Sequence, residues 1–286
     1  MIKNQKLYDC IPFYQSNLLF ELRLHTLSNI VDKFVVCEAT KSHSGEKKEL
    51  IFDLKRFDKF RDKIEYIVVD DMPENKSKIF DKYPLYNFQI DKLINGVKEA
   101  EDEDFIMISD EDEIPNPNVI KDYNCENFKY AIFLQNLYYY KFNIQNKDEF
   151  NGNEWPGSRI CKKKSLKKFS TFRSLKTKNS KAPFWKFWKE KSIQLIKNGG
   201  WHFTYLMNAE NIAKKIKSSE HNEFNRLTFT QIKKIEYRMN NLIDPFDRSN
   251  RLKRVNIDES FPEYLIKNQD FYSEWILKWF IFQNHL

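Results

Sequence analysis

The feature that most constrains the fold is a short apolar run, Phe105–Ile108, which holds no polar residue and is followed, after one serine, by four consecutive acids. A strand that is apolar on both faces fits the centre of a parallel sheet covered by helices on each side. Stretches with helical periodicity separate this run from three earlier strand-like runs. These are Leu7–Ile11, Lys33–Glu38 and Ile64–Val69. The alternation predicts an α/β domain with a mostly parallel central sheet flanked by helices.

The second half of the chain is less regular. Tyr130–Phe142 is long and aromatic and predicts another strand. Helical patterns are expected at Leu18–Leu27, Leu85–Ala100, Ala209–Ser218 (with Asn208 as N-cap), Phe229–Ile243 and Phe271–Phe282. A length of 286 residues fits one large domain, and two packed halves are the second possibility.

The composition indicates a globular protein, because 41% of the residues are hydrophobic and 16% are aromatic. The longest apolar runs fall far short of the ~20 residues that span a bilayer. The sequence also starts without the apolar region of a signal peptide. The four cysteines lack the spacing of a zinc site. We therefore expect reduced thiols, at least two of them in buried strands, and a cytoplasmic location.

The four acids after the apolar run, Asp110 to Glu113, are the most informative segment. Ligands of an open parallel sheet bind beyond the carboxyl ends of its strands. Four carboxylates repel one another there unless a cation lies among them, and hard divalent cations take such oxygen ligands together with phosphate oxygens. The alternative is an ordinary acidic loop. The position after a buried strand favours a metal site, with Asp112 as a direct ligand and Asp110 contacting the metal or a ribose.

Further blocks follow one another along the chain: Tyr8–Phe13, Glu21–Leu24, Val31–Thr40, Ser44–Gly45 with Lys48, Ile67–Pro73, Ile108–Pro115, Gly200–Tyr205, Lys215–Ile216 with His221 and Glu223, and Phe261–Tyr264. In these blocks and in their order the chain resembles glycosyltransferase family 17. The resemblance implies a GT-A type, Rossmann-like glycosyltransferase fold. It also implies inverting transfer, from a UDP-sugar that is usually UDP-N-acetylglucosamine to a glycan acceptor. A divalent cation, Mn²⁺ or Mg²⁺, is implied at the Asp-x-Asp motif.

The same resemblance implies a single catalytic domain over residues 1–286, with a nucleotide-sugar half at 1–125 and an acceptor half at 126–286. The expected donor-binding residues are Arg23, Glu38, Thr40, Lys48, Asp110, Trp155 and Gly200. For Arg23 the alternative is a surface arginine, and for Glu38 it is an acid that accepts nearby backbone groups. The family often has an arginine where this chain has Ile90, which leaves open a non-catalytic relative.

Candidates for the remaining roles lie later in the chain. His202 and His221 are the candidates for a late metal ligand, although a lone histidine in an aromatic run is more often a hydrogen-bonded core residue. Inverting transfer needs a carboxylate base, for which we favour Glu223 over Glu154. Trp155 could stack on a sugar face or anchor an irregular loop.

The basic residues are concentrated between Arg159 and Lys191, where thirteen lysines and arginines face one acid, Glu190. The same segment carries the aromatic run Phe184–Trp188. A solvated surface, an anionic acceptor or membrane surface, and a nucleic-acid contact would each use these features. A nucleic-acid-binding protein is the alternative function, but such a module has no need of a carboxylate cluster at a sheet edge.

Overall fold

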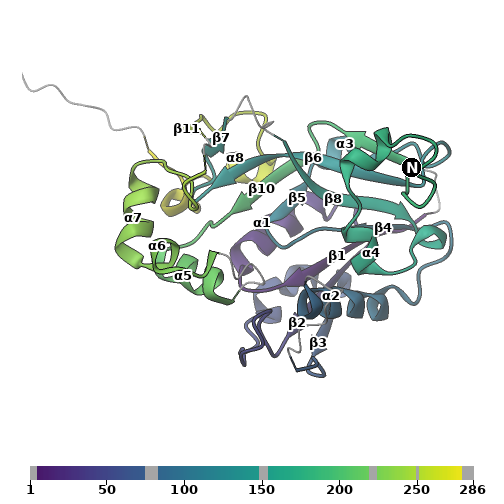
Figure 1. Ribbon diagram of the computed structural model, residues 1–286, viewed down its shortest axis with the longest axis horizontal. Coiled ribbons are helices and arrows are strands. Elements are labelled where there is room, and N and C mark those ends of the chain that lie inside the picture. The colour runs from purple at the N-terminus through teal and green to yellow at the C-terminus, as the bar shows by residue number, and fades with distance from the viewer. Residues whose placement is uncertain (1–4, 75–82, 148–153, 219–223, 249–250, 279–286) are drawn as a thin grey trace, which may run out of the picture.

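The fold is described from a computed structural model, which covers residues 5–74, 83–147, 154–218, 224–248 and 251–278. Within these ranges eleven strands form one sheet that runs through the molecule (Figure 1). The strands are β1 (Leu7–Phe13), β2 (Lys33–Ala39), β3 (Ile64–Val69), β4 (Phe105–Ile108), β5 (Glu113–Pro115), β6 (Tyr130–Tyr139), β7 (Ile144–Asn146), β8 (Glu154–Lys162), β9 (Ile193–Ile196), β10 (Gly200–Thr204) and β11 (Leu252–Arg254).

The helices are short. The α-helices are α1 (Asn17–Leu27), α2 (Pro84–Asp91), α3 (Pro117–Ile120), α4 (Phe169–Arg173), α5 (Ala209–Ser218), α6 (Leu227–Thr230), α7 (Ile232–Asn240) and α8 (Glu263–Lys267). The 3-10 helices are η1 (Leu54–Lys63), η2 (Lys92–Val97), η3 (Lys163–Ser165), η4 (Thr177–Lys181) and η6 (Ser273–Trp275). Helices α5, α6 and α7 pack together at one end of the molecule, whereas α2 and α4 lie beside the first strands (Figure 1).

The first four predicted strands form a parallel block in the order β3-β2-β1-β4. Successive side chains of a strand point to opposite faces of the sheet. Leu7, Ile11 and Phe13 accordingly join the core with α1 and η1, while Tyr8 and Cys10 join the core with α2, η2 and α4. Both faces of β1, β2 and β4 are therefore buried, as their apolar runs predict, whereas the edge strand β3 leaves Val68 41% exposed.

Beyond β4 the sheet is mixed, so the prediction of a mostly parallel sheet is wrong. β8 runs antiparallel to β4 and β6, and β7 runs antiparallel to β6 and β11. β9 and β10 run parallel to β6, and β10 is antiparallel to β5. In the described part of the connection from β6 to β8 the chain forms the short strand β7 and no crossover helix, whereas parallel neighbours are joined by a crossover that is usually a helix.

Several predicted helices are shorter in the structure or are interrupted. The 85–100 pattern divides into α2 and η2, and the 229–243 pattern breaks at Gln231 between α6 and α7. Of the predicted Phe271–Phe282 helix, the described part holds only one 3-10 turn, η6. The N-cap prediction is confirmed, because the Asn208 side chain accepts the Asn211 N–H at 2.9 Å.

The cysteine prediction is also confirmed, since Cys10, Cys37 and Cys161 are buried in β1, β2 and β8 and all four cysteines are free thiols. In the part of the chain that the structure describes, no helix combines the length and apolar character that a bilayer crossing requires.

Candidate active site

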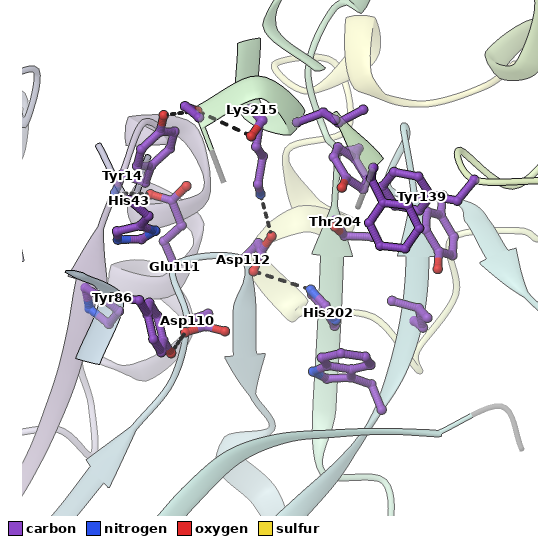
Figure 2. A pocket seen from close by; sticks show the side chains of 18 of the residues that line it. Tyr14, His43, Tyr86, Asp110, Glu111, Asp112, Tyr139, His202, Thr204 and Lys215 are labelled. Atoms are coloured by element: carbon purple, nitrogen blue, oxygen red, sulfur yellow. Dashed lines mark hydrogen bonds and ion pairs between the residues drawn. The ribbon is translucent and has the colours of Figure 1, made fainter. Parts of the chain in front are cut away.

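A pocket of about 370 Å³ opens beyond the carboxyl ends of β1 and β4 (Figure 2). Its wall combines the β1–α1 connection, the loop after β4, the carboxyl ends of β6 and β10, and α5. Residues from before position 125 and from after position 126 therefore face one space. The division into a nucleotide-sugar half and an acceptor half stays a prediction.

The four acids lie in the acidic loop, residues 109–113, which joins β4 to β5. The Ser109 N–H donates to the Cys10 carbonyl at 3.1 Å, which extends the β1–β4 ladder by one bond. Glu113 then pairs with His202 of β10 in the antiparallel register of β5. Two strands thus fix the ends of the loop, and its side chains Asp110, Glu111 and Asp112 line the pocket.

Asp112 is the acid at the centre of the pocket wall. Its Oδ2 lies 2.9 Å from Lys215 Nζ of α5, and its Oδ1 lies 3.3 Å from His202 Nε2 of β10 (Figure 2). Burial alone would raise the pKa of Asp112, but Lys215 and His202 outweigh it and the net shift is downward. Asp112 is therefore ionised at neutral pH and holds two elements together across the pocket.

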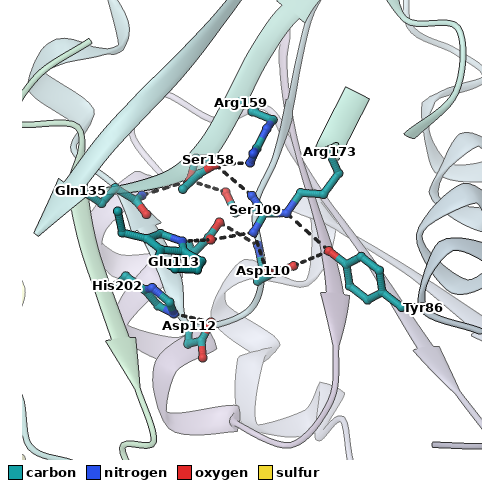
Figure 3. A network of polar contacts seen from close by, with 12 residues as sticks. Tyr86, Ser109, Asp110, Asp112, Glu113, Gln135, Ser158, Arg159, Arg173 and His202 are labelled. Atoms are coloured by element: carbon teal, nitrogen blue, oxygen red, sulfur yellow. Dashed lines mark hydrogen bonds and ion pairs between the residues drawn. The ribbon is translucent and has the colours of Figure 1, made fainter. Parts of the chain in front are cut away.

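Asp110 is held by a different cation, Arg173 at the end of α4. Arg173 Nη2 lies 2.5 Å from Asp110 Oδ2 and 2.6 Å from Glu113 Oε1, and the Tyr86 hydroxyl donates to Asp110 Oδ1 at 2.7 Å (Figure 3). Burial raises the pKa of Asp110, yet the Arg173 charge more than compensates and the net shift is downward. The protein's own basic residues thus neutralise much of the charge in the acidic loop.

Glu111 faces the opposite side of the loop, toward the start of α1. Its Oε2 accepts the backbone N–H groups of Tyr14, Gln15 and Ser16 at 2.7, 2.9 and 3.3 Å. Burial raises the pKa of Glu111, and the nearby charge of Lys215 opposes that shift only in part. Glu111 therefore ties the β1–α1 connection to the acidic loop, so that both sit in a fixed relation at the pocket.

Whether the pocket suits a divalent cation depends on its donor set. Among the described residues no group of three or more His, Cys, Asp and Glu side chains could together hold a metal ion. Mg²⁺ and Mn²⁺, however, are commonly bound by one or two carboxylates while substrate phosphates and water complete the shell. Asp112, with Asp110 beside it in the loop and His202 in contact, fits that kind of site once Lys215 releases Asp112.

Several predicted donor-binding residues are used inside the protein. Arg23 is completely buried, so the surface alternative is wrong: it pairs with Asp9 at 2.8 Å and donates to the backbone carbonyls of Asp110 and Glu113. Arg23 supports the acidic loop from the side of the protein core, and it does not line the pocket. A direct contact between Arg23 and a donor therefore has no support in this geometry.

Glu38 and Lys48 pair with each other away from the pocket wall. Glu38 also accepts the Ile51 and Phe52 N–H groups at 2.9 and 3.1 Å, which supports the backbone-accepting alternative. Thr40 likewise lies outside the pocket lining.

Gly200 is required by packing, because its φ is +130° and an added Cβ would lie 2.1 Å from the Ile114 carbonyl oxygen. Like Glu38, Lys48 and Thr40, it does not line the pocket. A donor role for these four residues is therefore not supported by their positions.

Trp155 lines the pocket and its contacts fit the anchoring alternative, while stacking on a sugar stays a prediction. Its indole N–H donates to Glu113 Oε1 at 2.6 Å, and its ring centre lies 4.8 Å from that of His202. The side chain nevertheless keeps 37% exposure. Glu154 is exposed and does not line the pocket. His221 and Glu223 lie outside the described residues.

Sequence reasoning did not assign a site role to Tyr14, Tyr86, Arg173 or Lys215, although all except Arg173 line the pocket and Arg173 contacts two of its acids. Lys215 does fall in one of the family-like blocks, which was the available signal. Arg173 was one basic residue among thirteen in its segment, and nothing in the sequence separated it from the others.

Two known enzymes are similar in sequence to part of this chain. The human and rat β-1,4-mannosyl-glycoprotein 4-β-N-acetylglucosaminyltransferases are 32% identical to the chain over 104 residues. That match covers 34% of this chain and 19% of each relative, so it spans about a fifth of the relatives' length.

Two solved structures are similar to the chain at a low level. A 4-diphosphocytidyl-2C-methyl-D-erythritol synthase has a TM-score of 0.34 at 11% identity, over 68% of this chain and 90% of that one. The glycosyltransferase GlyE of Streptococcus pneumoniae TIGR4 has a TM-score of 0.33 at 9% identity, over 68% and 46% of the two chains.

A family model decides the classification, because the model of glycosyltransferase family 17 matches residues 1–273, which is nearly the whole chain. The order of the sequence blocks and the acids at the end of a buried strand agree with that match. The chain therefore belongs to glycosyltransferase family 17.

Proposed function

We propose that this glycosyltransferase has a GT-A type fold and transfers N-acetylglucosamine from UDP-N-acetylglucosamine to a glycan acceptor, with inversion at the anomeric carbon. The observation that carries the proposal is the pairing of Asp110 and Asp112 with the cations Arg173 and Lys215 at one pocket. A pocket with carboxylates, a fixed arginine and an exchangeable lysine suits a nucleoside diphosphate, whose phosphates attract the lysine. The names of the human and rat relatives support N-acetylglucosamine as the sugar.

The basic residues would act on the leaving nucleotide. When the bond between sugar and phosphate breaks, negative charge grows on the diphosphate, and positive groups already fixed nearby stabilise it. Lys215 is 22% exposed at its side chain and is positioned to exchange Asp112 for a phosphate oxygen. Arg173 is held by two carboxylates, so it keeps its position and acts mainly by holding Asp110.

A divalent cation, Mn²⁺ or Mg²⁺, would be held by Asp112, with Asp110 and His202 as neighbouring donors. Such an ion supplies Lewis acidity toward the diphosphate oxygens. The release of Lys215 from Asp112 would then free a carboxylate oxygen at the same time as it frees the lysine for phosphate.

The acceptor hydroxyl needs a base, and we propose Glu223, with Glu154 as the second choice. Phe224, which follows Glu223 in the chain, lines the pocket, and so does Trp155, which follows Glu154. Alanine at the true base should lower turnover by about 10²–10⁴-fold and leave donor affinity nearly unchanged.

The test is a transfer and donor-hydrolysis screen of the full chain with UDP- and GDP-sugars, each with Mn²⁺, with Mg²⁺ and with EDTA. We expect turnover of UDP-N-acetylglucosamine that requires the metal. Activity that survives EDTA would disprove the cation, and turnover of a different donor would disprove the sugar. A chain that binds a UDP-sugar yet never hydrolyses or transfers it would indicate the non-catalytic alternative.

A further inference from the structure

The basic segment 159–191 does not behave as one unit in the structure. Four of its basic residues pair with carboxylates elsewhere: Lys162 with Glu103 and Glu126, Lys164 with Glu103, Lys168 with Asp91, and Arg173 with Asp110 and Glu113. Arg159 is buried and donates to the carbonyls of Gly157 and Leu175. The early part of the segment is therefore largely neutralised within the fold.

The later part, residues 176–191, keeps its charge. Its six lysines have no carboxylate partner among the described residues, and its one acid, Glu190, lies 3.6 Å from Lys129 outside the segment. Lys176, Lys178 and Lys181 are exposed. This stretch presents a net positive surface that no other described part of the protein compensates.

The same stretch exposes four large aromatic side chains. Phe184, Trp185, Phe187 and Trp188 are 84%, 60%, 85% and 67% exposed. Removing such apolar area from water is favourable, so a monomer normally does not leave four neighbouring aromatics in solvent.

The backbone explains why these four residues project together. The Lys186 N–H donates to the Pro183 carbonyl at 3.0 Å, and the Lys189 N–H donates to the Lys186 carbonyl at 3.1 Å. Two successive turns result, and the two central positions of each turn hold one aromatic pair. The rings of each pair pack edge to face, with centres 5.2 and 5.4 Å apart. We call residues 183–189 the aromatic loop.

The aromatic loop is not part of the candidate active site. It leads into β9, where Ile193 pairs with Tyr130 at the start of β6, whereas the pocket is lined by Leu137 and Tyr139 at the other end of that strand. Nine residues of extended strand separate the two ends by about 30 Å. Sugar stacking on these rings would therefore not present an acceptor to the acidic loop.

We propose that residues 176–191 dock the protein on an anionic lipid bilayer. The aromatic loop enters the headgroup region, where tryptophan is enriched, and the exposed lysines meet lipid phosphates. Two turn tips suit shallow insertion into a flat surface. Single-stranded nucleic acid is bound instead along a charged groove that tracks its backbone. The function of the docking is to hold the transferase at a membrane while its pocket stays about one strand length away.

The first experiment is co-sedimentation of the full chain with phosphatidylglycerol-rich and pure phosphatidylcholine vesicles, at low and at physiological salt. We expect binding to the acidic vesicles alone, and weaker binding as salt rises. Serine at positions 184, 185, 187 and 188 should reduce the partition by more than about tenfold. The matched control, Leu227→Ser with Tyr237→Ser and Phe271→Ser, removes exposed apolar groups elsewhere and should bind as the wild type does.

Charge is tested separately. The combined variant with Lys176→Gln, Lys178→Gln and Lys181→Gln should weaken vesicle binding by on the order of 100-fold. This corresponds to a loss of less than about tenfold for each lysine. Removing three exposed lysines at other sites, Lys55, Lys121 and Lys253, should have a much smaller effect. Brominated lipids should quench wild-type tryptophan fluorescence, and Trp185→Phe with Trp188→Phe should lose most of that quenching while binding persists.

Three results would overturn the proposal: no binding to acidic vesicles, equal binding by the serine variant, or tighter binding to a nucleic-acid control at the same salt. Unchanged tryptophan fluorescence in the presence of brominated lipid would equally overturn insertion of the aromatic loop.

Discussion

Arg23 and Arg173 hold the same acidic loop from two sides, and they differ in what surrounds them. Arg23 and its partner Asp9 are both 0% exposed, and Arg23 reaches the loop through backbone carbonyls. Arg173 is 10% exposed and reaches the loop through the carboxylates of Asp110 and Glu113. The inner contact fixes the shape of the loop, whereas the outer contact holds the Asp110 side chain, which lines the pocket.

The difference shows how a charged residue can be essential without touching a ligand. Burial raises the pKa of Asp9 even against the adjacent arginine, so desolvation dominates this pair. Such a pair contributes little net stability, yet the loss of one partner leaves a buried charge alone. In the pocket, water and ligands can replace a missing partner, so substitutions there should affect catalysis more than folding.

The largest expected effect is on stability and comes from the inner side. Arg23→Met should lower the free energy of unfolding by about 3–5 kcal/mol, because Asp9 then remains as an unpaired buried charge. Urea denaturation measures it. Arg56→Met is the control: its pair with Glu21 is 37% and 20% exposed, and its loss should cost less than about 1 kcal/mol. The double variant Asp9→Asn with Arg23→Met should recover part of the loss, and no recovery would contradict this explanation.

The next effect is on turnover and comes from the pocket side. Asp112→Asn should lower turnover by about 10²–10³-fold and lower stability much less than Arg23→Met does, because asparagine keeps an oxygen acceptor for Lys215 and the residue lines the pocket. Steady-state transfer assays at saturating donor measure it, with the exposed Asp122→Asn as a control. Near-normal activity would show that Asp112 is a structural partner of Lys215 and His202 only.

Arg173→Met should fall between these two cases. We expect a loss of about 1–3 kcal/mol in stability, since Glu113 keeps its bond from Trp155, together with a fall in turnover of about 10–100-fold. Arg173→Lys should recover part of the stability and less of the turnover, because lysine cannot bridge two carboxylates in the same geometry. If stability falls as far as in Arg23→Met, the contrast between the inner and outer sides of the loop is wrong.

The smallest expected effect is on the pH dependence of stability, and it comes from Glu111, which ties the acidic loop to the β1–α1 connection. The folded pKa of Glu111 is raised, so its ionised form costs stability at neutral pH, and that cost disappears as the pH falls through the folded pKa toward the unfolded value. Glu111→Gln should therefore flatten the mildly acidic part of the stability curve, measured by urea unfolding from pH 7 to pH 4.5. Asp110 and Asp112 have lowered pKa values, so their contributions are lost only at lower pH. A steeper curve in the variant would contradict the assignment.

The sequence alone determined the elements whose pattern is local. The strands predicted at 7–11, 33–38, 64–69 and 105–108 are all present, and the burial of the first, second and fourth on both faces follows from their runs of apolar residues. The acids after Ile108 were predicted to lie at a ligand site because a parallel sheet places the carboxyl ends of its strands at one edge. Asp110, Asp112 and His202 do meet at one pocket, and their metal binding stays a prediction.

Only the tertiary structure decided which charges meet. The antiparallel return of β8, the insertion of Arg173 from a distant helix and the pairing of Lys215 with Asp112 across 103 positions all depend on contacts between remote segments. The sequence alone does not distinguish the surroundings of Arg23, Arg173 and the exposed lysines, because all of them are basic residues. The solvent around each residue differs, and that solvent sets the strength of its electrostatic interactions. One arginine therefore supports the loop, another lies beside the pocket, and the lysines remain on the surface.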